Sequence, residues 1–496
     1  MDTKSESLTK YKMWIGGEWT EATSGAYFES YNPYTGKPWA LMPRAGAADI
    51  DRAVQAAHQA FTAGAWPKMT ASQRGALLRK LGDLITDNAD ALAKIEVRDN
   101  GKLFSEMRGQ TAYMAQWYYY FGGLADKIEG AVIPSDKADT FNYTEHEPLG
   151  VVAAIVPWNS PLLLTAWKLA PALAAGNTAV IKPSEFTSAS LLEFCKLIEK
   201  AGFPPGVVNA VTGFGDEAGA PLIEHPLVAK ITFTGSDKTG QRIYETAARG
   251  MKRVSLELGG KSPNIVFDDA DLDNAVKGAI SGIFAATGQT CIAGSRLLVQ
   301  RSIHDRFVDK LVAFAKTARI GDPMSLDTQV GPVTTPPQYK KVLDYLDIAK
   351  SEGATTALGG NRAEEFGGYF VEPTIFTGVR NSMRIAQEEV FGPVLAVIPF
   401  EDEEDAIAIG NDVVFGLAAG VWTQSMRRAF LMAKRLQAGT VWINTYRAVS
   451  YLSPFGGYKR SGIGRESGQE MIKEYLQTKS VWISMATEVP NPFVMR

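Results

Sequence analysis

The sequence predicts an α/β protein with two larger domains and a small β element. With 496 residues, the chain is too long for one ordinary core and fits two or three domains. Between residues 150 and 260, short apolar runs alternate with helical segments, which indicates βαβ units and a buried parallel sheet. The 47 glycines suit the many tight turns between strands and helices in such a protein.

The first 130 residues are predicted to be mainly helical. Alanine-rich, amphipathic patterning covers residues 49–60 and 72–100, and a second helical stretch covers residues 106–127. Its aromatic run, Trp117 to Phe121, is expected to pack in the core, although one edge could line a pocket. Residues 130–148 are predicted to form a polar hairpin and residues 480–486 an isolated strand. Because such small pieces are marginal alone, we expect both to pair with another subunit.

The central series has strands at 151–156, 178–184, 207–213, 229–236 and 253–260, with helices at 161–176, 189–202, 216–225 and 238–250. Ligands of parallel sheets bind at the carboxyl ends of the strands. Residues 157–160, 182–185, 234–236 and 257–260 all fall at such ends. A strand at 264–270, a helix at 272–286 and a strand at 291–300 begin a second α/β domain, which is expected to extend to about Gly457.

Composition excludes several classes of protein. The net charge is only −3, so neither a nucleic-acid surface nor a polybasic membrane patch is indicated. No apolar stretch of about 18 residues and no apolar leader is present, and a disulfide-stapled secreted protein does not fit two cysteines, so we expect a cytoplasmic protein. The four histidines are scattered without ligand spacing, so no metal site is expected.

Three residues are candidates for covalent chemistry. Cys291 lies in a turn of small residues after a helix, where backbone N–H groups could favour a thiolate; Cys195 lies in an apolar helical pattern typical of a core thiol. Glu257 is an acid in an apolar strand, where burial would raise its pKa and suit a general base. Asn159 could donate to an oxyanion. From context alone, a structural cysteine and a paired strand-end acid remain open alternatives, and a lone asparagine favours a simple turn-forming role.

A second group of residues suits a dinucleotide. Lys182 could bind a ribose or phosphate oxygen, and Glu185 could accept from both ribose hydroxyls while repelling a 2′-phosphate, which favours NAD over NADP. Gly235 and Ser236 precede a helix, whose N-terminus could hold a pyrophosphate. The alternative for Glu185 is a simple interaction with a helix dipole, and the glycine fingerprint of dinucleotide-binding folds is absent.

Taken together and in order, these segments resemble the aldehyde dehydrogenase superfamily over nearly the whole chain, in particular its hydrolytic, NAD(P)-dependent branch. The matching motifs are IVPWNSPLLLTAWKLAPALAAGNTAVIKPSE, ITFTGSDKTG, LELGGKSPNIV, GQTCIAGSR, EEVFGPV and PFGGYKRSGIGRE. The resemblance implies a Rossmann-like NAD-binding domain (1–129 and 149–256), an α/β catalytic domain (257–460) and a small β oligomerisation element (130–148 and 476–496). It also implies NAD as cofactor, with NADP possible, and a homodimer or homotetramer.

The resemblance assigns roles to individual residues. Cys291 is the nucleophile, Glu257 the general base, and Asn159 with the backbone N–H of Cys291 the oxyanion hole. Lys168 and Glu466 support the base and its proton path. The implied cofactor contacts are Pro157, Trp158, Lys182, Glu185, Gly235, Ser236, Glu389 and Phe391. The residues expected by position to line the aldehyde channel are Met114, Leu162, Leu163, Trp167, Thr290, Ile292 and Tyr446.

These channel residues are mostly apolar, which suits an aliphatic or aromatic aldehyde. Ala285 stands where betaine-aldehyde enzymes often carry an aromatic residue, and no arginine directly precedes Cys291 to hold a second carboxylate. Betaine-aldehyde and semialdehyde oxidation therefore remain alternatives. Branches that acylate coenzyme A tend to lack a glutamate at position 257, so that reaction is a minor alternative. A non-redox thiol esterase would need a histidine partner from His225 or His304, and a scaffolding relative would have lost Cys291 or Glu257.

Overall fold

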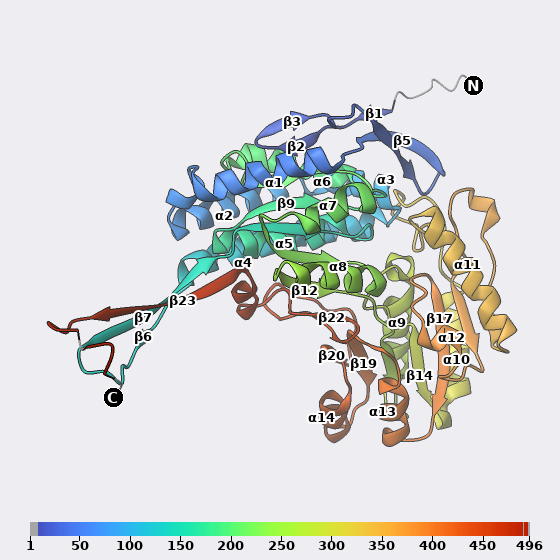
Figure 1. Cartoon of the computed structure of the whole chain (residues 1–496). Coiled ribbons are helices and arrows are strands. Elements are labelled where there is room, and N and C mark those ends of the chain that lie inside the picture. Colours follow the sequence, from blue (N-terminus) through green and yellow to red (C-terminus); the bar gives the residue numbers. More distant parts are fainter. Residues whose placement is uncertain (1–7, 490, 495–496) are drawn as a thin grey trace.

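The computed structural model describes residues 8–489 and 491–494. It confirms the predicted α/β class: two large, mainly parallel sheets lie in separate layers of helices, and a third, small sheet projects from them as an arm (Figure 1). Among the described residues, no helix has the length and apolar character needed to cross a bilayer.

The first large sheet has eight strands, and its central strands run parallel. Antiparallel strands complete both edges. The spatial order is β22 (Gly462–Ile463), β12 (Arg253–Glu257), β11 (Val228–Thr234), β8 (Val151–Ile155), β9 (Thr178–Lys182), β10 (Val208–Ala210), β2 (Met13–Ile15) and β3 (Glu18–Thr20).

Helices cover both faces of this sheet because successive side chains of each strand point to opposite faces. Val151 and Ala153 of β8 pack with one group of helices, whereas Val152 and Ala154 pack with the other. The first group is α1 (Ala47–Thr62), α7 (Ala220–Glu224) and α8 (Asp237–Arg249). The second is α2 (Ala71–Asp87), α3 (Ala89–Asn100), α4 (Phe104–Leu124), α5 (Pro161–Ala175) and α6 (Ala189–Ala201).

The second large sheet has seven strands, all parallel except the edge strand β15. Its order is β15 (Thr355–Leu358), β16 (Thr374–Thr377), β17 (Val394–Phe400), β14 (Arg296–Gln300), β13 (Pro263–Val266), β19 (Ala418–Trp422) and β20 (Thr440–Ile443). The helices around it are α9 (Leu272–Phe284), α10 (His304–Ala315), α11 (Pro336–Ser351), α12 (Arg384–Gln387), α13 (Glu403–Asn411) and α14 (Met426–Arg435).

Three smaller strand groups complete the fold. β1 (Thr9–Lys10), β5 (Lys37–Pro43) and β4 (Tyr27–Asn32) form one sheet, and β18 (Phe415–Gly416) pairs with β21 (Tyr458–Lys459). The projecting arm consists of β23 (Leu476–Ser484), β7 (Thr140–Pro148) and β6 (Val132–Ile133).

Several sequence predictions need correction. The strand expected to be isolated at 480–486 belongs to β23, which pairs antiparallel with β7 along nine residues of the same chain. The helix expected over 72–100 is broken at Asn88, whose backbone leaves the helical region and ends α2. The N-terminal strands β1 to β5 were not foreseen. Residues 291–295 form a turn, so the strand expected at 291–300 begins only at Arg296.

Candidate active site

The two large sheets are joined by a very short connection. β12 ends at Glu257 in the first sheet, and β13 begins at Pro263 in the second, so only residues 258–262 lie between them. β12 runs parallel to β11 and β13 runs parallel to β14, and the connection leaves the carboxyl end of β12 and enters the second sheet directly. The functional candidates gather around this connection.

The connection contains Gly259 and Gly260 because neighbouring groups leave no space for a side chain. A Cβ on Gly260 would lie 2.4 Å from the carbonyl oxygen of Cys291, and one on Gly259 would lie 2.6 Å from Oε2 of Glu389. The backbone N–H of Gly260 donates to Oε1 of Glu389 at 2.9 Å. Glycine at 259 and 260 thus lets three sequence-distant segments meet.

Cys291 is half-buried in the turn after α9. The helix expected over 272–286 ends at Phe284, because Ala286 and Thr287 adopt left-handed conformations with φ of 52° and 55°. Burial, followed by the nearby charges of Glu389 and Glu257, raises the pKa of the Cys291 thiol to about 12, although the backbone N–H groups of Cys291 and Ile292 oppose this shift. Without ligand, Cys291 is therefore a neutral thiol whose surroundings include the backbone donors that a thiolate needs.

Glu257 is buried, and its Oε2 has no hydrogen-bond partner among the described residues. Burial raises its pKa well above the usual value, and the negative charge of Glu466 adds to this effect, whereas Lys168 and Arg465 lower it. Lys168 and Glu466 form a fully buried ion pair, and Nζ of Lys168 also donates to Oγ1 of Thr234 at 2.7 Å. A protonated acid beside a buried ion pair can act as a base once it loses its proton.

Asn159 follows β8 and is buried, and its Nδ2 donates to the carbonyl oxygen of Gln289 at 2.9 Å. Because an amide nitrogen carries two hydrogens, the second remains available. Gln289 lies two positions before Cys291 in the chain, so this hydrogen bond ties the amide to the loop of the thiol. The structure therefore brings Asn159, Cys291 and Glu257 to one place from β8, the loop after α9 and β12.

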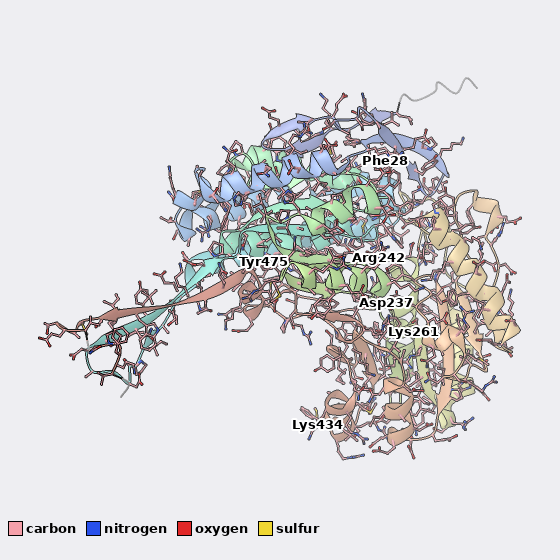
Figure 2. All side chains as sticks on the ribbon, in the orientation of Figure 1. Phe28, Asp237, Arg242, Lys261, Lys434 and Tyr475 are labelled. Carbon is pink, nitrogen blue, oxygen red and sulfur yellow. The ribbon has the colours of Figure 1, made fainter. Side chains whose placement is uncertain are left out.

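A separate pocket with a volume of about 430 Å³ lies at the carboxyl ends of the first sheet. Its lining includes six of the predicted cofactor residues: Pro157, Trp158, Lys182, Glu185, Gly235 and Ser236. Arg242 of α8 lines it as well (Figure 2), which the sequence did not indicate. Burial lowers the pKa of Lys182 to about 8, while the charge of Glu185 opposes this.

The pocket fits a dinucleotide. Its size is within the usual ligand range, the N-terminus of α8 suits a pyrophosphate, and Lys182 with Glu185 suits a ribose. Glu389 and Phe391 do not line this pocket. Glu389 contacts the glycine connection, and the ring of Phe391 lies 5.3 Å from that of Trp158, so both lie between the pocket and Cys291.

The predicted channel residues lie on several elements, and all except Thr290 belong to or pack against the same hydrophobic core cluster as Cys291. Met114, Leu162, Trp167, Ile292 and Tyr446 are buried, whereas Leu163 and Thr290 are half-buried. The hydroxyl of Tyr446 donates to the carbonyl of Ile292 at 3.0 Å. Trp167 stacks on Trp117 with ring centroids 5.7 Å apart and packs against Phe455. Trp117, Tyr118 and Phe121 of the aromatic run in α4 are buried in the core, as expected for packing.

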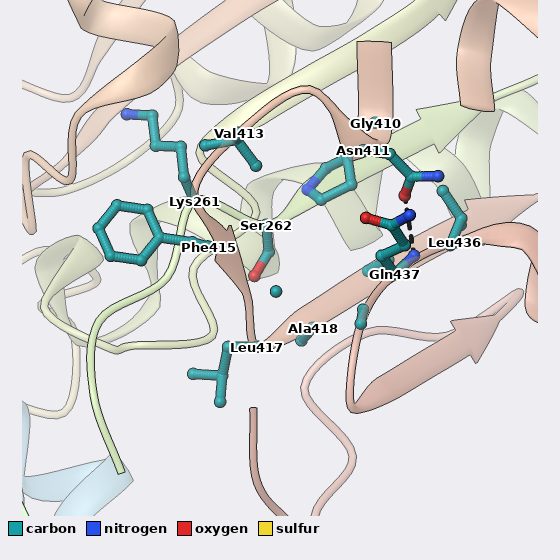
Figure 3. Close-up of a pocket in the computed structure, with 14 residues that line it drawn as sticks. Lys261, Ser262, Gly410, Asn411, Val413, Phe415, Leu417, Ala418, Leu436 and Gln437 are labelled. Carbon is teal, nitrogen blue, oxygen red and sulfur yellow. Dashed lines mark hydrogen bonds between the residues drawn. The ribbon is translucent and has the colours of Figure 1, made fainter. Parts of the chain in front are cut away.

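Another cavity, lined by Lys261, Ser262 and segments near Gly410 and Leu436, follows directly after the glycine connection (Figure 3). Its volume is about 10 Å³, which holds about one water molecule. This cavity is therefore too small for an aldehyde or a cofactor. Within the described residues, no group of three or more potential ligands is arranged to hold a metal ion.

Comparisons with known proteins agree with one another. The model of the aldehyde dehydrogenase family matches residues 19–481. A (Z)-2-((N-methylformamido)methylene)-5-hydroxybutyrolactone dehydrogenase from Acinetobacter baylyi is 48% identical over 99% of this chain and 100% of that protein. The NAD⁺ complex of an aldehyde dehydrogenase from Bacillus cereus superimposes with a TM-score of 0.94 at 47% identity, covering 96% of this chain and 97% of that one. A betaine aldehyde dehydrogenase from Staphylococcus aureus in complex with NAD⁺ gives 0.96 at 41% identity, covering 98% and 96%.

The close approach at Gly260 predicts a sharp sensitivity to a single methyl group. We expect Gly260→Ala to displace the Cys291 carbonyl, and because ~1 Å of misplacement can cost ~10²-fold in rate, activity should fall by about that factor. Gly109→Ala is the matched control, since a Cβ there meets nothing within 4 Å and should stabilise α4 by about 0.4–1 kcal/mol. Steady-state activity and thermal unfolding of both variants measure the effect, and equal activities would contradict the assignment.

Proposed function

Because the chain belongs to the aldehyde dehydrogenase family and is an NAD-dependent aldehyde-oxidising enzyme, we propose that it forms a thioester on Cys291 and hydrolyses it with water activated by Glu257. The observation that carries this proposal is the glycine connection, which places the buried acid at the end of β12 beside the half-buried thiol. We also propose a division into an NAD-binding domain (1–129 and 149–256), a catalytic domain (257–460) and an oligomerisation element (130–148 and 476–496).

In the first stage, the Cys291 thiol gives its proton to solvent water, the resulting thiolate attacks the aldehyde carbon, and the C=O π electrons move to oxygen. The free hydrogen of the Asn159 amide and the backbone N–H of Cys291 hold this oxyanion. When bound, NAD supplies the acceptor for the hydride that leaves the carbon, so that a thioester remains on Sγ.

In the second stage, Glu257 takes a proton from water, whose oxygen attacks the thioester carbon, and the C–S bond breaks to release the acid. The proton then passes toward the buried pair of Lys168 and Glu466. The net reaction consumes one water and releases one proton. The proposed cofactor contacts and channel residues are those named from the sequence.

For the substrate we propose an aliphatic or aromatic aldehyde. Lys102 lies close enough to Cys291 for the charge of the thiolate to affect its pKa, so a cationic side chain stands near the thiol. A cationic aldehyde would be repelled there. The likeness to a betaine aldehyde dehydrogenase keeps betaine aldehyde as the second candidate.

The proposed assembly is a homodimer or homotetramer built through the arm, in the cytoplasm. Val132, Trp482 and Ile483 of the arm are large, exposed apolar side chains, which a second copy could cover.

Replacement of the nucleophile tests the central claim. Cys291→Ser should abolish aldehyde-dependent formation of NADH, because a serine hydroxyl is far less readily ionised than a thiol. The absorbance of NADH measures the rate, and Cys195→Ser is the matched control, since Cys195 is fully buried in α6 away from this site. Retention of aldehyde-driven NADH formation by the Cys291 variant would contradict the mechanism.

Replacement of the base should change the rates of the two stages differently. Glu257→Gln should still produce a burst of about one NADH per site, whereas steady-state turnover should fall by ~10²–10⁴-fold, as for loss of a general base. Since the pKa of Glu257 is raised, the active carboxylate form increases with pH, and wild-type hydrolysis should accelerate as pH rises while the variant loses this dependence. Stopped-flow and steady-state rates across pH measure both, and an unchanged steady-state rate would remove Glu257 from this role.

A substrate panel tests the specificity. We expect kcat/KM for medium-chain and aromatic aldehydes to exceed that for betaine aldehyde and succinic semialdehyde, and NAD to be preferred over NADP because Glu185 repels a 2′-phosphate. Parallel assays with both cofactors give the ranking. A preference for betaine aldehyde would establish the second candidate instead.

A further inference from the structure

A buried group of charged side chains lies beside the catalytic loops but has no part in the mechanism above. Glu96 and Lys102 come from α3 and the turn after it, and both are buried. Neither carboxyl oxygen of Glu96 has a hydrogen-bond partner among the described residues. Nζ of Lys102 donates to Oγ of Ser160 at 2.7 Å.

This lysine is close to the nucleophile. Burial lowers the pKa of Lys102, and the negative charges of Glu106, Glu96 and the Cys291 thiolate oppose that shift. Holding an amine in such a place is costly unless it makes good hydrogen bonds. Its ammonium group donates to the hydroxyl of Ser160, the residue directly after Asn159.

The hydrogen bonds around Lys102 form a closed frame. The carbonyl of Asn100 accepts from Oγ1 of Thr334 at 2.6 Å, and the backbone N–H of Thr334 donates to Oε1 of Gln289 at 2.8 Å. The carbonyl of Gln289 accepts from Nδ2 of Asn159 at 2.9 Å. Asn159 is followed in the chain by Ser160, whose hydroxyl accepts from Lys102. Because Lys102 lies two residues after Asn100, where the series of hydrogen bonds began, the frame is closed.

A second tie joins the same helix boundary to the thiol loop. Oε1 of Glu106, in the first turn of α4, accepts from the backbone N–H of Ala286 at 3.0 Å. Ala286 is one of the two residues with left-handed backbone between α9 and Cys291. Such conformations persist where the surroundings enforce them. The segment from Lys102 to Glu106 therefore contacts both the residue that follows the oxyanion donor and the loop of the nucleophile.

We propose that Lys102 is a positioning residue that, through its hydrogen bond to Ser160, holds the Asn159 amide where the substrate oxyanion forms. This inference rests on the proposed function, because it needs Asn159 to be the oxyanion donor. Ser160 begins α5 without capping it by a side-chain hydrogen bond. The bond from Lys102 is thus what fixes the Ser160 side chain.

The sharpest variants are Ser160→Ala, which removes the acceptor and keeps the lysine, and Lys102→Met, which removes the donor and keeps the apolar stem. Steps that create an oxyanion should slow about tenfold or more in either variant, since ~1 Å of misplacement can cost ~10²-fold. These steps are the NADH burst with an aldehyde and the hydrolysis of p-nitrophenyl acetate. The double variant should be no slower than the slower single variant, because both changes break one bond.

Two readouts separate positioning from general damage. Alkylation of Cys291 by iodoacetamide forms no oxyanion, and NAD binds in a separate pocket, so both should match wild type in Ser160→Ala, which keeps the charge of Lys102 near the thiolate. Ser160→Thr, which keeps the hydroxyl, should restore the burst rate. Lys94→Met, at an exposed lysine of α3, is the control for loss of charge.

Equal burst rates in wild type, Ser160→Ala and Lys102→Met would overturn the inference. So would a parallel loss of alkylation and NAD binding, which marks a collapsed site. Failure of the proposed function has a different signature: wild-type protein whose Cys291 is alkylated normally would form no NADH from any aldehyde in the panel.

Discussion

The connection between β12 and β13 is the constraint on which the site depends. It is only five residues long, from 258 to 262, and it joins the two large sheets at the carboxyl end of one and the amino end of the other. Gly259 and Gly260 allow the backbone to touch Glu389 and the Cys291 carbonyl. A longer connection would let the sheets separate, and a side chain at either glycine would push the nucleophile away from the base. The same few residues thus set the distance between the fold's two halves and the geometry of the reacting groups.

The surroundings of this connection are built at a cost in stability. Lys168, Glu466, Glu257, Lys102 and Glu96 are all buried, and burial of ionisable groups is unfavourable unless partners compensate. Lys168 with Glu466 and Lys102 with Ser160 are compensated, whereas Glu96 and one oxygen of Glu257 are not. Left-handed residues add strain in the thiol loop at Ala286 and Thr287, and in the β20 loop at Asn444 and Arg447. Such strain and unpaired groups are tolerated where chemistry needs them.

Sequence periodicity predicted the central strands and helices well, because β8 to β12 are buried on both faces and read as continuous apolar runs. The sequence patterns did not predict the N-terminal strands. Strands such as β1 and β4 are short or carry mixed polar and apolar residues. The break between α2 and α3 lies at Asn88, where the sequence has no proline or glycine that would indicate the end of a helix. The nucleophile, base and amide stood out as polar residues at strand ends and turns. Lys102 and Gln289 did not, since their role depends on contacts between distant segments, although a lysine after Asn-Gly at a helix end was a visible signal.

The protonation states of the two reacting groups explain how the buried site remains stable between turnovers. Both Cys291 and Glu257 have raised pKa values, so without ligand the site holds a thiol and a carboxylic acid rather than two like charges close together. Each charge then appears only in the stage that uses it. The thiolate is consumed when the C–S bond forms, and its charge passes to the oxygen held by Asn159. The carboxylate is needed only afterwards, when the thioester is neutral and no longer opposes a negative Glu257. The Asn159 amide, which holds the oxyanion of the first stage, is already fixed by its hydrogen bond to the Gln289 carbonyl. The ion pair of Lys168 and Glu466, toward which the proton of the second stage passes, is already formed. Neither stage therefore requires the interior to reorganise.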